Sequence, residues 1–360
     1  MTAPLGPNAT IGIIGGGQLA RMLASSAARL GFRTIVLEPG AECPAAQVCN
    51  QHIVAGYDDP AALDELQNAC DVVTYEFENV PLSAASHLQG QVPLYPPAKA
   101  LEVSQDRLLE KQFLQQAGLQ VADFHNVENG DDLATALQEF GGGILKTRRF
   151  GYDGKGQHVF KSADDENGAA IIDELGGGPF VLERKINFLS EFSVIAARAV
   201  GGSTCAFDPS TNLHEGGILR RSTVPAQLSD AAATKARAMA TELLGALDYV
   251  GVIGVEFFLA GDSQGGEQLL INEFAPRVHN SGHWTREACA TSQFEQHMRA
   301  VAGHQLGSVE RYHDCEMLNL LGDEALNIEA HLAEPASQVT LYGKLEAREG
   351  RKMGHVTRLK

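Results

Sequence analysis

Residues 11–20 read Ile-Gly-Ile-Ile-Gly-Gly-Gly-Gln-Leu-Ala: an apolar run, a glycine string and the start of a helical pattern. A strand that turns through glycines into a helix is the first unit of a parallel, doubly wound sheet. The alternation continues outward, with apolar runs at 33–37, 53–54, 71–75 and 92–95 separated by helical stretches. The first hundred residues therefore predict an α/β head built on a parallel sheet.

The glycine string also fits a dinucleotide-binding fingerprint. Glu38 ends the next predicted strand, where an acidic residue would bind a ribose. The spacing alone is a weak signal, because glycines there also serve close strand–helix packing or other kinds of phosphate binding. A nicotinamide-dependent oxidoreductase is therefore one hypothesis for function.

The regular alternation of predicted strands and helices ends at Pro96-Pro97, and two predicted helices are then followed by many predicted strands. A long Ala-rich helix at 230–247 separates these strands from a predicted hairpin. We predict three domains: a Rossmann-like head at 1–103, a mixed body at 104–300 with a strand-rich subdomain at about 140–210, and a small C-terminal domain at 301–360.

Composition excludes several classes of function. The 360 residues carry 28 Lys and Arg against 45 Asp and Glu, a net charge of −17, which disfavours nucleic acids and anionic membranes as partners. A local basic pocket is still allowed, because screening confines a field to about 10 Å. Six scattered cysteines, no basic and apolar leader pattern and no long apolar run lead us to expect a reduced, cytoplasmic protein without a membrane segment.

Residues 146–156 read Lys-Thr-Arg-Arg-Phe-Gly-Tyr-Asp-Gly-Lys-Gly and place cations beside glycines. Glycines let backbone N–H groups approach phosphate oxygens, and the cations neutralise their charge. The loop is not of the Walker A type, because the trailing Lys-Ser/Thr is missing. A flexible surface hairpin is the alternative, but the density of cations in an acidic protein favours phosphate binding.

Two glutamates fall on the predicted hairpin, whose strands are 250–260 and 268–274 with a turn at 262–266. This arrangement places Glu256 directly opposite Glu273, with Cβ atoms about 5 Å apart on one face. Two bare carboxylates would repel, and a hard dication held by their oxygens removes the conflict. Apolar neighbours argue against two solvent-facing strand ends, so we predict a metal site at these two residues.

A polar segment follows the second strand. Residues 276–285 read Pro-Arg-Val-His-Asn-Ser-Gly-His-Trp-Thr, a density of polar groups that is not typical of core packing and indicates a substrate loop. The chain end, around Lys344 and Arg351, is locally basic and would either cover an anion or form a solvated terminus. Glu183, Glu191 and His214 carry no distinctive signal by themselves.

Several of these strings occur together in one known family. Gly-Gly-Gly-Gln-Leu at 15–19, Tyr-Glu-Phe-Glu-Asn-Val at 75–80, Gln-Asp-Arg-Leu at 105–108 and the run from Glu273 to Thr285 resemble ATP-grasp ligases. More narrowly, they resemble the 5-(carboxyamino)imidazole ribonucleotide synthases of purine biosynthesis, from residue 11 to about 356. The resemblance implies an ATP-grasp fold with an N-terminal Rossmann-like pre-ATP-grasp domain, which binds no nicotinamide, and a C-terminal domain that completes the substrate site.

The resemblance also implies a reaction. Bicarbonate and ATP would give carboxyphosphate, and the exocyclic amine of 5-aminoimidazole ribonucleotide would capture either this species or CO₂ released from it, with ADP and phosphate released. ATP and Mg²⁺, with Mn²⁺ as a substitute, would be required, and the enzyme would be a homodimer. The alternative within the same fold is an ATP-grasp ligase with another acyl donor such as formate.

Site residues carry over by motif. The triphosphate would be held by Arg107, Lys146 and the loop Gly151, Tyr152, Asp153, Gly154, Lys155, Gly156 and Gln157. Glu183 and the backbone of Arg184, Lys185 and Ile186 would line the adenine, Glu191 would bind the ribose, and His214 would lie near the nucleotide. Asn272 would share the phosphate–metal site with Glu256 and Glu273. The substrate and bicarbonate side would comprise Glu76, Tyr152, Asp153, Arg277, His279 and Asn280, with Lys344 and Arg351 on the substrate 5′-phosphate.

Overall fold

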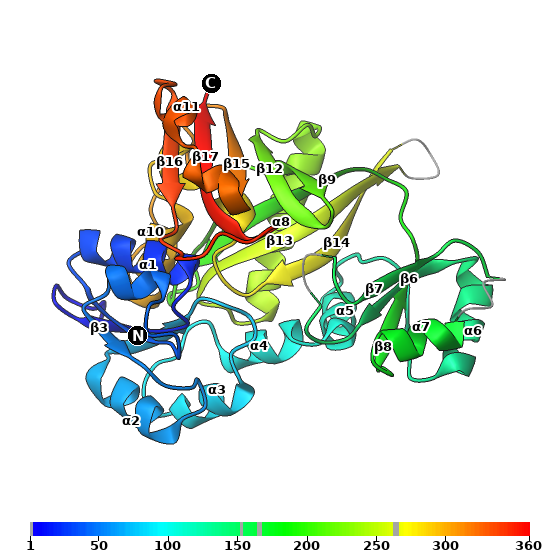
Figure 1. Cartoon of the computed structure of the whole chain (residues 1–360), viewed down its shortest axis with the longest axis horizontal. Helices are drawn as coiled ribbons and strands as arrows, with labels where there is room; N and C mark the ends of the chain where they lie inside the picture. The colour runs from blue at the N-terminus through cyan, green and yellow to red at the C-terminus, as the bar shows by residue number, and fades with distance from the viewer. Residues whose placement is uncertain (1–2, 152–153, 164–167, 262–265) are drawn as a thin grey trace.

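The computed structural model describes residues 3–151, 154–163, 168–261 and 266–360 (Figure 1). The head is a parallel sheet, as predicted, and its four strands lie in the order β3-β2-β1-β4. Its elements are β1 (Thr10–Ile14), α1 (Gln18–Arg29), β2 (Arg33–Leu37), η1 (Pro44–Gln47), β3 (Gln51–Ile53), α2 (Pro60–Ala69), β4 (Val72–Tyr75) and α3 (Leu82–Leu88). The strand expected at 92–95 is reduced to one bridge between Leu94 and Val73.

Two short helices, α4 (Ala98–Ser104) and α5 (Arg107–Gln116), lead out of the head. A second, antiparallel sheet follows in the order β5-β8-β6-β7 and projects to the right in Figure 1. It contains β5 (Phe124–Val127), α6 (Gly130–Phe140), β6 (Gly143–Thr147), β7 (Gln157–Phe160), α7 (Gly168–Glu174) and β8 (Phe180–Glu183). This part, the lid, has a small core of its own around Leu145, Phe160 and Phe180.

The remaining strands form one nine-stranded sheet in the order β14-β13-β9-β11-β12-β15-β17-β16, with β10 paired to β9. Its elements are β9 (Phe188–Arg198), β10 (Thr204–Ala206), β11 (Ser210–Glu215), β12 (Ile218–Val224), α8 (Asp230–Ala246), β13 (Gly251–Gly261), β14 (Glu267–Ala275), η2 (Asn280–Gly282), α9 (Thr285–Ala288), α10 (Gln293–Val301), β15 (Cys315–Leu321), η3 (Gly322–Leu326), α11 (Glu329–Leu332), β16 (Ser337–Leu341) and β17 (Lys352–Leu359). The sheet continues from the body into the C-terminal strands.

Local chemistry explains where several helices begin and end. Asp106 precedes α5 and accepts hydrogen bonds from the N–H groups of Leu108 and Leu109, at 3.0 and 3.4 Å. Asn129 caps α6 in the same way, and Gly141 ends that helix with φ of 70°, a left-handed conformation that favours glycine. These caps fix where α5 and the lid helix start.

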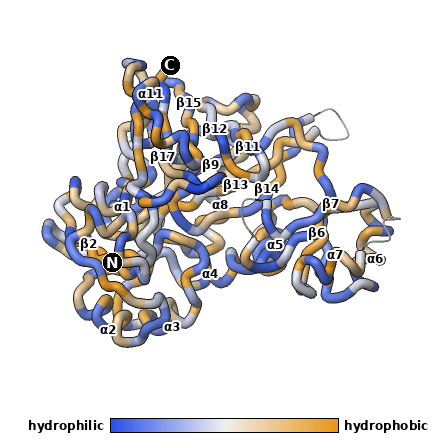
Figure 2. Tube along the Cα trace, in the orientation of Figure 1, coloured by the Kyte–Doolittle hydropathy of each residue, from blue (hydrophilic) through white to orange (hydrophobic). Residues whose placement is uncertain are grey.

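A shared core joins the head to the large sheet. Ile11 and Leu23 of the head pack in one buried cluster with Ile195, Trp284 and Tyr342. Hydrophobic and hydrophilic residues are interspersed along the trace in Figure 2. Within the described ranges, no helix combines the length and the apolar character needed to cross a membrane.

The structure excludes one of the two alternatives for the chain end, a solvated terminus. Residues 352–359 form β17, which pairs with both β15 and β16. His355, Val356 and Thr357 are fully buried there. Sequence analysis did not predict this strand, because two of its buried side chains, His355 and Thr357, are not apolar.

Candidate active site

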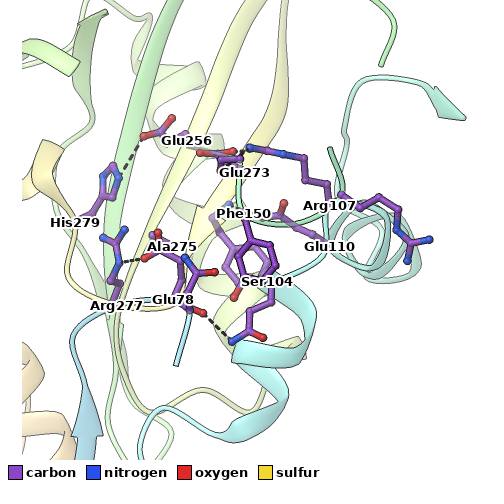
Figure 3. A pocket seen from close by; sticks show the side chains of 15 residues that line it. Glu78, Ser104, Arg107, Glu110, Phe150, Glu256, Glu273, Ala275, Arg277 and His279 are labelled. Atoms are coloured by element: carbon purple, nitrogen blue, oxygen red, sulfur yellow. Dashed lines mark hydrogen bonds and ion pairs between the residues drawn. The ribbon is translucent and has the colours of Figure 1, made fainter. Parts of the chain in front are cut away.

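The β13–β14 hairpin carries the predicted carboxylate pair. Its register places Glu256 opposite Glu273, as predicted, and Figure 3 shows both side chains at the cavity wall. The register changes at this pair, since Phe257 already faces Ile271. Asn272 is therefore an extra residue on β14, a β-bulge of the kind that re-aims side chains next to active sites.

The bulge brings a third oxygen donor to the site. Asn272 lines the same cavity as the two glutamates, and its buried Oδ1 has no hydrogen-bond partner among the described residues. Burial and the neighbouring Glu273 raise the pKa of Glu256. Burial opposes ionisation of Glu273 as well, but Arg107 outweighs it and holds the pKa of Glu273 low. Two close carboxylates and an orphaned amide oxygen fit a hard divalent cation.

Each carboxylate also has a nitrogen partner. Arg107 Nη1 donates to Glu273 Oε2 at 2.7 Å, and His279 Nε2 lies 3.4 Å from Glu256 Oε1 (Figure 3). Burial, followed by the charge of Arg277, lowers the pKa of His279 to about 3, so its ring is neutral near pH 7. In the described ranges, no group of three or more His, Cys, Asp or Glu side chains could hold a metal, so the donor set depends on Asn272.

Lys146 lies on β6 at the cavity wall and is itself paired. Its Nζ donates to Glu183 Oε2 at 3.0 Å, and the buried Lys111 Nζ reaches the same oxygen at 3.3 Å. Burial alone would raise the pKa of Glu183, but Lys111 and then Lys146 lower it to about 2. The other oxygen, Glu183 Oε1, is buried without a hydrogen-bond partner among the described residues. Sequence reasoning missed Lys111, because an isolated lysine on a charged helix gives no motif.

A second pair lies farther along the cavity. Glu191 on β9 and His214 on β11 are joined at 2.6 Å between Oε2 and Nδ1, because the two strands pair antiparallel. Burial opposes protonation of His214, but Glu191 and Glu256 together raise the pKa of His214. Sequence reasoning did not predict β11, so only the family resemblance indicated that these two residues share a site.

Arg277 connects this site to the head. Its guanidinium bonds Glu78, which follows β4, and Figure 3 shows the pair beside His279. Burial would raise the pKa of Glu78, but Arg277 lowers it to about 2. Sequence reasoning used Glu78 only as part of a motif string. Asn280 forms two amide hydrogen bonds with Asn319 of β15, at 2.9 and 2.7 Å.

One cavity of about 410 Å³ brings most predicted residues together. The predicted residues that line it are Arg107, Lys146, Gly151, Gly154, Gln157, Glu191, His214, Glu256, Asn272, Glu273, Arg277, His279 and Asn280. Gln18, Phe188, Phe258 and Lys352 also line it and were not predicted. The predicted residues Glu76, Lys155, Gly156, Glu183, Arg184, Lys185, Ile186, Lys344 and Arg351 are not part of its lining. Tyr152 and Asp153 lie outside the described residues.

Lid residues that do not line the cavity have other contacts. Gly156 C=O accepts a hydrogen bond from Thr147 N–H at 2.8 Å, and Gly156 has a left-handed φ of 71°. The Arg184 side chain turns away to Asp123, at 2.9 Å, and stacks over Phe140. Its backbone N–H is also engaged, because it donates to Asp123 C=O at 2.8 Å.

The glycine string of the head holds the protein's own carboxylates. Glu76 accepts from the N–H groups of Gly17 and Ala20 at 2.8 and 3.2 Å, and Glu38 accepts from Gly16 N–H at 2.9 Å. These N–H groups at the start of α1 are the ones a dinucleotide pyrophosphate would need. A substituent on Gly17 would meet Glu76 Oε1 at 2.6 Å, so the glycines serve close packing around Glu76.

The basic segment between β16 and β17 lies next to the head. Gln47 Nε2 donates to Gly343 O at 2.8 Å, and the charge of Glu76 acts on Lys344. Lys344 Nζ donates to Lys352 O at 2.7 Å, and burial, followed by Arg351, lowers the pKa of Lys344 to about 8. Arg351 Nη1 donates to Glu346 O at 2.9 Å.

Three segments of the chain match known domain families. Residues 8–105 match the ribonucleotide synthetase preATP-grasp domain, residues 112–294 the ATP-grasp domain, and residues 315–360 the phosphoribosylaminoimidazole carboxylase C-terminal domain. The fold and the site together define an ATP-grasp ligase.

Whole-length relatives narrow this class. The chain is 56% identical over 357 residues to the N5-carboxyaminoimidazole ribonucleotide synthase of Brucella melitensis, covering 99% of this chain and 98% of that protein. It is 42% identical over 358 residues to the enzyme of that name from Bacillus subtilis, covering 98% and 92%. The chain belongs to the N5-carboxyaminoimidazole ribonucleotide synthase family, ATP-dependent ligases of purine biosynthesis, and the oxidoreductase hypothesis is wrong.

Solved structures of the same enzyme family also match this chain. An N5-carboxyaminoimidazole ribonucleotide synthetase in complex with ADP matches with a TM-score of 0.93 at 40% identity, over 100% of this chain and 94% of that one. The enzyme from Aspergillus clavatus, in complex with ADP and 5-aminoimidazole ribonucleotide, matches with a TM-score of 0.90 at 31% identity, over 98% and 94%.

Proposed function

We propose that this chain uses ATP and bicarbonate to carboxylate the exocyclic amine of 5-aminoimidazole ribonucleotide. The observation that carries the proposal is the carboxylate pair Glu256 and Glu273, set beside Arg107 and Lys146 in one cavity. Cations and metal-binding oxygens at one place suit phosphoryl transfer, which depends mostly on positioning and charge neutralisation. The family relatives, one of them solved in complex with ADP and this nucleotide, support the same substrates.

The reaction proceeds in two steps, and each step forms one bond and breaks another. A bicarbonate oxygen attacks the γ-phosphorus, the bond to ADP breaks, and carboxyphosphate forms. The substrate amine then attacks the carboxyl carbon, the carbon–oxygen bond to phosphate breaks, and the amine loses a proton. Phosphorylation is needed because bicarbonate itself is a poor electrophile with no good leaving group.

Arg107 and Lys146 neutralise the triphosphate, together with the loop from Gly151 to Gln157. Arg277 lies near the attacking bicarbonate, held in place by Glu78. Glu183 and the segment 184–186 line the adenine, and Glu191 binds the ribose with His214 beside it. Water must be kept from carboxyphosphate, and closure of the lid over the cavity would exclude it.

Mg²⁺, or Mn²⁺ in its place, would be held by Glu256, Glu273 and Asn272. It would supply positive charge at the phosphate oxygens. The protein's own contribution is the bulge, which directs the three oxygens into one cavity.

The substrate would lie between the head and the basic segment. Lys344 and Arg351 bind its 5′-phosphate, while Glu76, Tyr152 and Asp153 face the imidazole. Gln47 of the head donates to the carbonyl of Gly343, the residue before Lys344, which supports a common site. We further propose a cytoplasmic homodimer, with domains at 1–103, 104–300 and 301–360.

The test is ADP release with Mg²⁺-ATP, with bicarbonate and the nucleotide supplied together, singly or not at all. We expect fast release only with both. A rate of ADP release that does not depend on the nucleotide would contradict the proposed acceptor. An equal rate with formate in place of bicarbonate would contradict the proposed acyl donor.

A further inference from the structure

Two adjacent residues of α5, Glu110 and Lys111, have no part in the reaction proposed above. Their exposed fractions are only 3% and 1%. Burying a charged side chain costs free energy unless it is well partnered. Each has a partner on β14, the strand that carries Glu273, and Lys111 also pairs with Glu183 of β8.

Glu110 and Lys111 bind the backbone on either side of Glu273. Glu110 Oε1 accepts from Phe274 N–H at 2.8 Å. Lys111 Nζ donates to Asn272 C=O at 3.4 Å, while also reaching Glu183. One residue therefore holds the backbone after Glu273 and the other holds the bulge residue before it.

This segment of β14 needs such support. Among the described strands, β14 is the edge of the nine-stranded sheet, and an isolated bridge between Val121 and Ile271 is the only pairing on its outer side. The bulge at Asn272 interrupts the ladder on the inner side as well. On the outer side, Gln120 C=O accepts from Ile271 N–H at 2.8 Å, and the two α5 side chains continue the coverage to Phe274.

Helical spacing makes α5 suited to the task. Arg107 lies one turn before Glu110 and Lys111, on the same helix face, and bonds the Glu273 carboxylate itself. The start of α5 is fixed by its cap Asp106. Arg148 donates to the two carboxylate oxygens of Asp106, from Nη2 at 2.7 Å and from Nε at 2.9 Å. One rigid helix end thus contacts the Glu273 side chain and the backbone on both sides of it.

We propose that Glu110 and Lys111 are positioning residues that clamp the β14 bulge and aim Asn272 and Glu273 at the divalent cation. The inference rests on the proposed function, because it assigns these two residues to its metal site. Residues that orient metal ligands from behind typically change metal affinity by about 10–100-fold when they are lost.

The test measures Mn²⁺ binding to the full chain with ADP by electron paramagnetic resonance, and ADP binding without metal by calorimetry. Glu110→Met removes the acceptor for Phe274 N–H at similar side-chain size, whereas Glu110→Gln keeps an acceptor oxygen. We expect Glu110→Met to weaken Mn²⁺ binding by about tenfold or more. Glu110→Gln should restore it to nearly the wild-type value, and metal-free ADP binding should change little in either variant.

Lys111→Met is the second variant, in case Glu110→Met does not fold. It removes the donor to Asn272 C=O, leaves Lys146 on Glu183, and should show the same selective loss of Mn²⁺ binding. Gln112→Met, an exposed position on the same helix, is the control and should change neither quantity. Circular dichroism verifies that each variant is folded.

Normal Mn²⁺ binding in a folded Glu110→Met or Lys111→Met chain would overturn the inference alone. Equal losses in Glu110→Gln and Glu110→Met would also overturn it, because the charge and not the hydrogen bond would then matter. A wild-type chain that binds ADP but no Mn²⁺ would contradict the metal site of the proposed function, and the inference with it.

Discussion

At the scale of single residues, the site depends on charges whose partners are close and partly shielded from water. Glu256 and Glu273 face each other across two strands; the Arg107 guanidinium balances the charge of Glu273, whereas the nitrogen beside Glu256 belongs to the neutral ring of His279. Such a pair is unfavourable unless positive charge lies between or beside it. The carboxylate pair therefore does not stabilise the fold, and single substitutions of its members should affect catalysis more than folding.

Glu273→Ala should lower kcat by about a hundredfold or more, the scale of losing one preorganised electrostatic contact at the transition state. The melting temperature should change little, because Glu273 lies on an edge strand. Glu102→Ala, an exposed carboxylate on α4, is the matched control. Near-wild-type turnover of Glu273→Ala at saturating Mg²⁺ would show that this residue is not a metal ligand.

Lys344→Ala should raise the KM of the imidazole nucleotide by about tenfold or more, since a charge-assisted hydrogen bond contributes about 1.5–3 kcal/mol. The KM of ATP should change much less, because Lys344 is not part of the cavity lining. Steady-state kinetics with each substrate varied in turn measure both values. Equal increases would mean that Lys344 does not hold the substrate phosphate.

The pKa of Lys344, lowered to about 8, gives a pH dependence. The ammonium binds phosphate only when it is protonated, so kcat/KM for the imidazole nucleotide should fall as pH rises through about 8. Lys344→Arg should move this decline to higher pH, because a guanidinium stays charged across the accessible range. A decline that is identical in the arginine variant would assign it to another group.

At the scale of elements, sequence analysis predicted the parts with a regular apolar pattern and missed the bulge and the strands that lack such a pattern. The strand–helix alternation of the head and the opposition of Glu256 and Glu273 followed from periodicity. The bulge at Asn272 did not, because one extra residue in a strand leaves no trace in an apolar pattern. β11 and β17 were missed because buried Asn212, His355 and Thr357 break the apolar alternation.

Family resemblance contributed where physical pattern could not. It placed Glu191 and His214 near the nucleotide, although β11 was not predicted, and the structure joins them at 2.6 Å. Neither route identified Lys111, Glu110 or Glu78 as functional residues, since their roles exist only through contacts with distant segments. Such residues become visible when burial and partners are known.

The glycine-rich segment that ends at Gly156, which we expect to bind phosphate, gives a prediction at this scale. Gly156 has a left-handed φ of 71°, and a Cβ atom there would meet Thr147 Oγ1 at 2.6 Å. Gly156→Ala should therefore strain the loop by about 1–2 kcal/mol and raise the KM of ATP. Gly130→Ala, where nothing lies within 4 Å, is the control. An unchanged KM and unchanged hydrogen exchange at 147–157 in Gly156→Ala would argue against a nucleotide-binding loop.

At the scale of the whole molecule, the head and the large sheet each have a core of their own and share a further core that also includes the C-terminal strands, whereas the described residues of the lid have only their separate small core. Regions with separate cores commonly open as independent units. Native-state hydrogen exchange should show β6 and β8 opening at lower free energy than β1, β13 and β17, which should open together. Separate opening of the head and the C-terminal strands would contradict the shared core.

The central claim is that the Glu256–Glu273 site directs the γ-phosphate of ATP onto bicarbonate. The most direct measurement supplies bicarbonate labelled with heavy oxygen, together with Mg²⁺-ATP and 5-aminoimidazole ribonucleotide, and analyses the released phosphate by mass spectrometry. Because the attacking oxygen stays on phosphorus when the carboxyl group is transferred, we expect one labelled oxygen in the phosphate. Unlabelled phosphate, formed at the same rate as the carboxylated product, would contradict the claim.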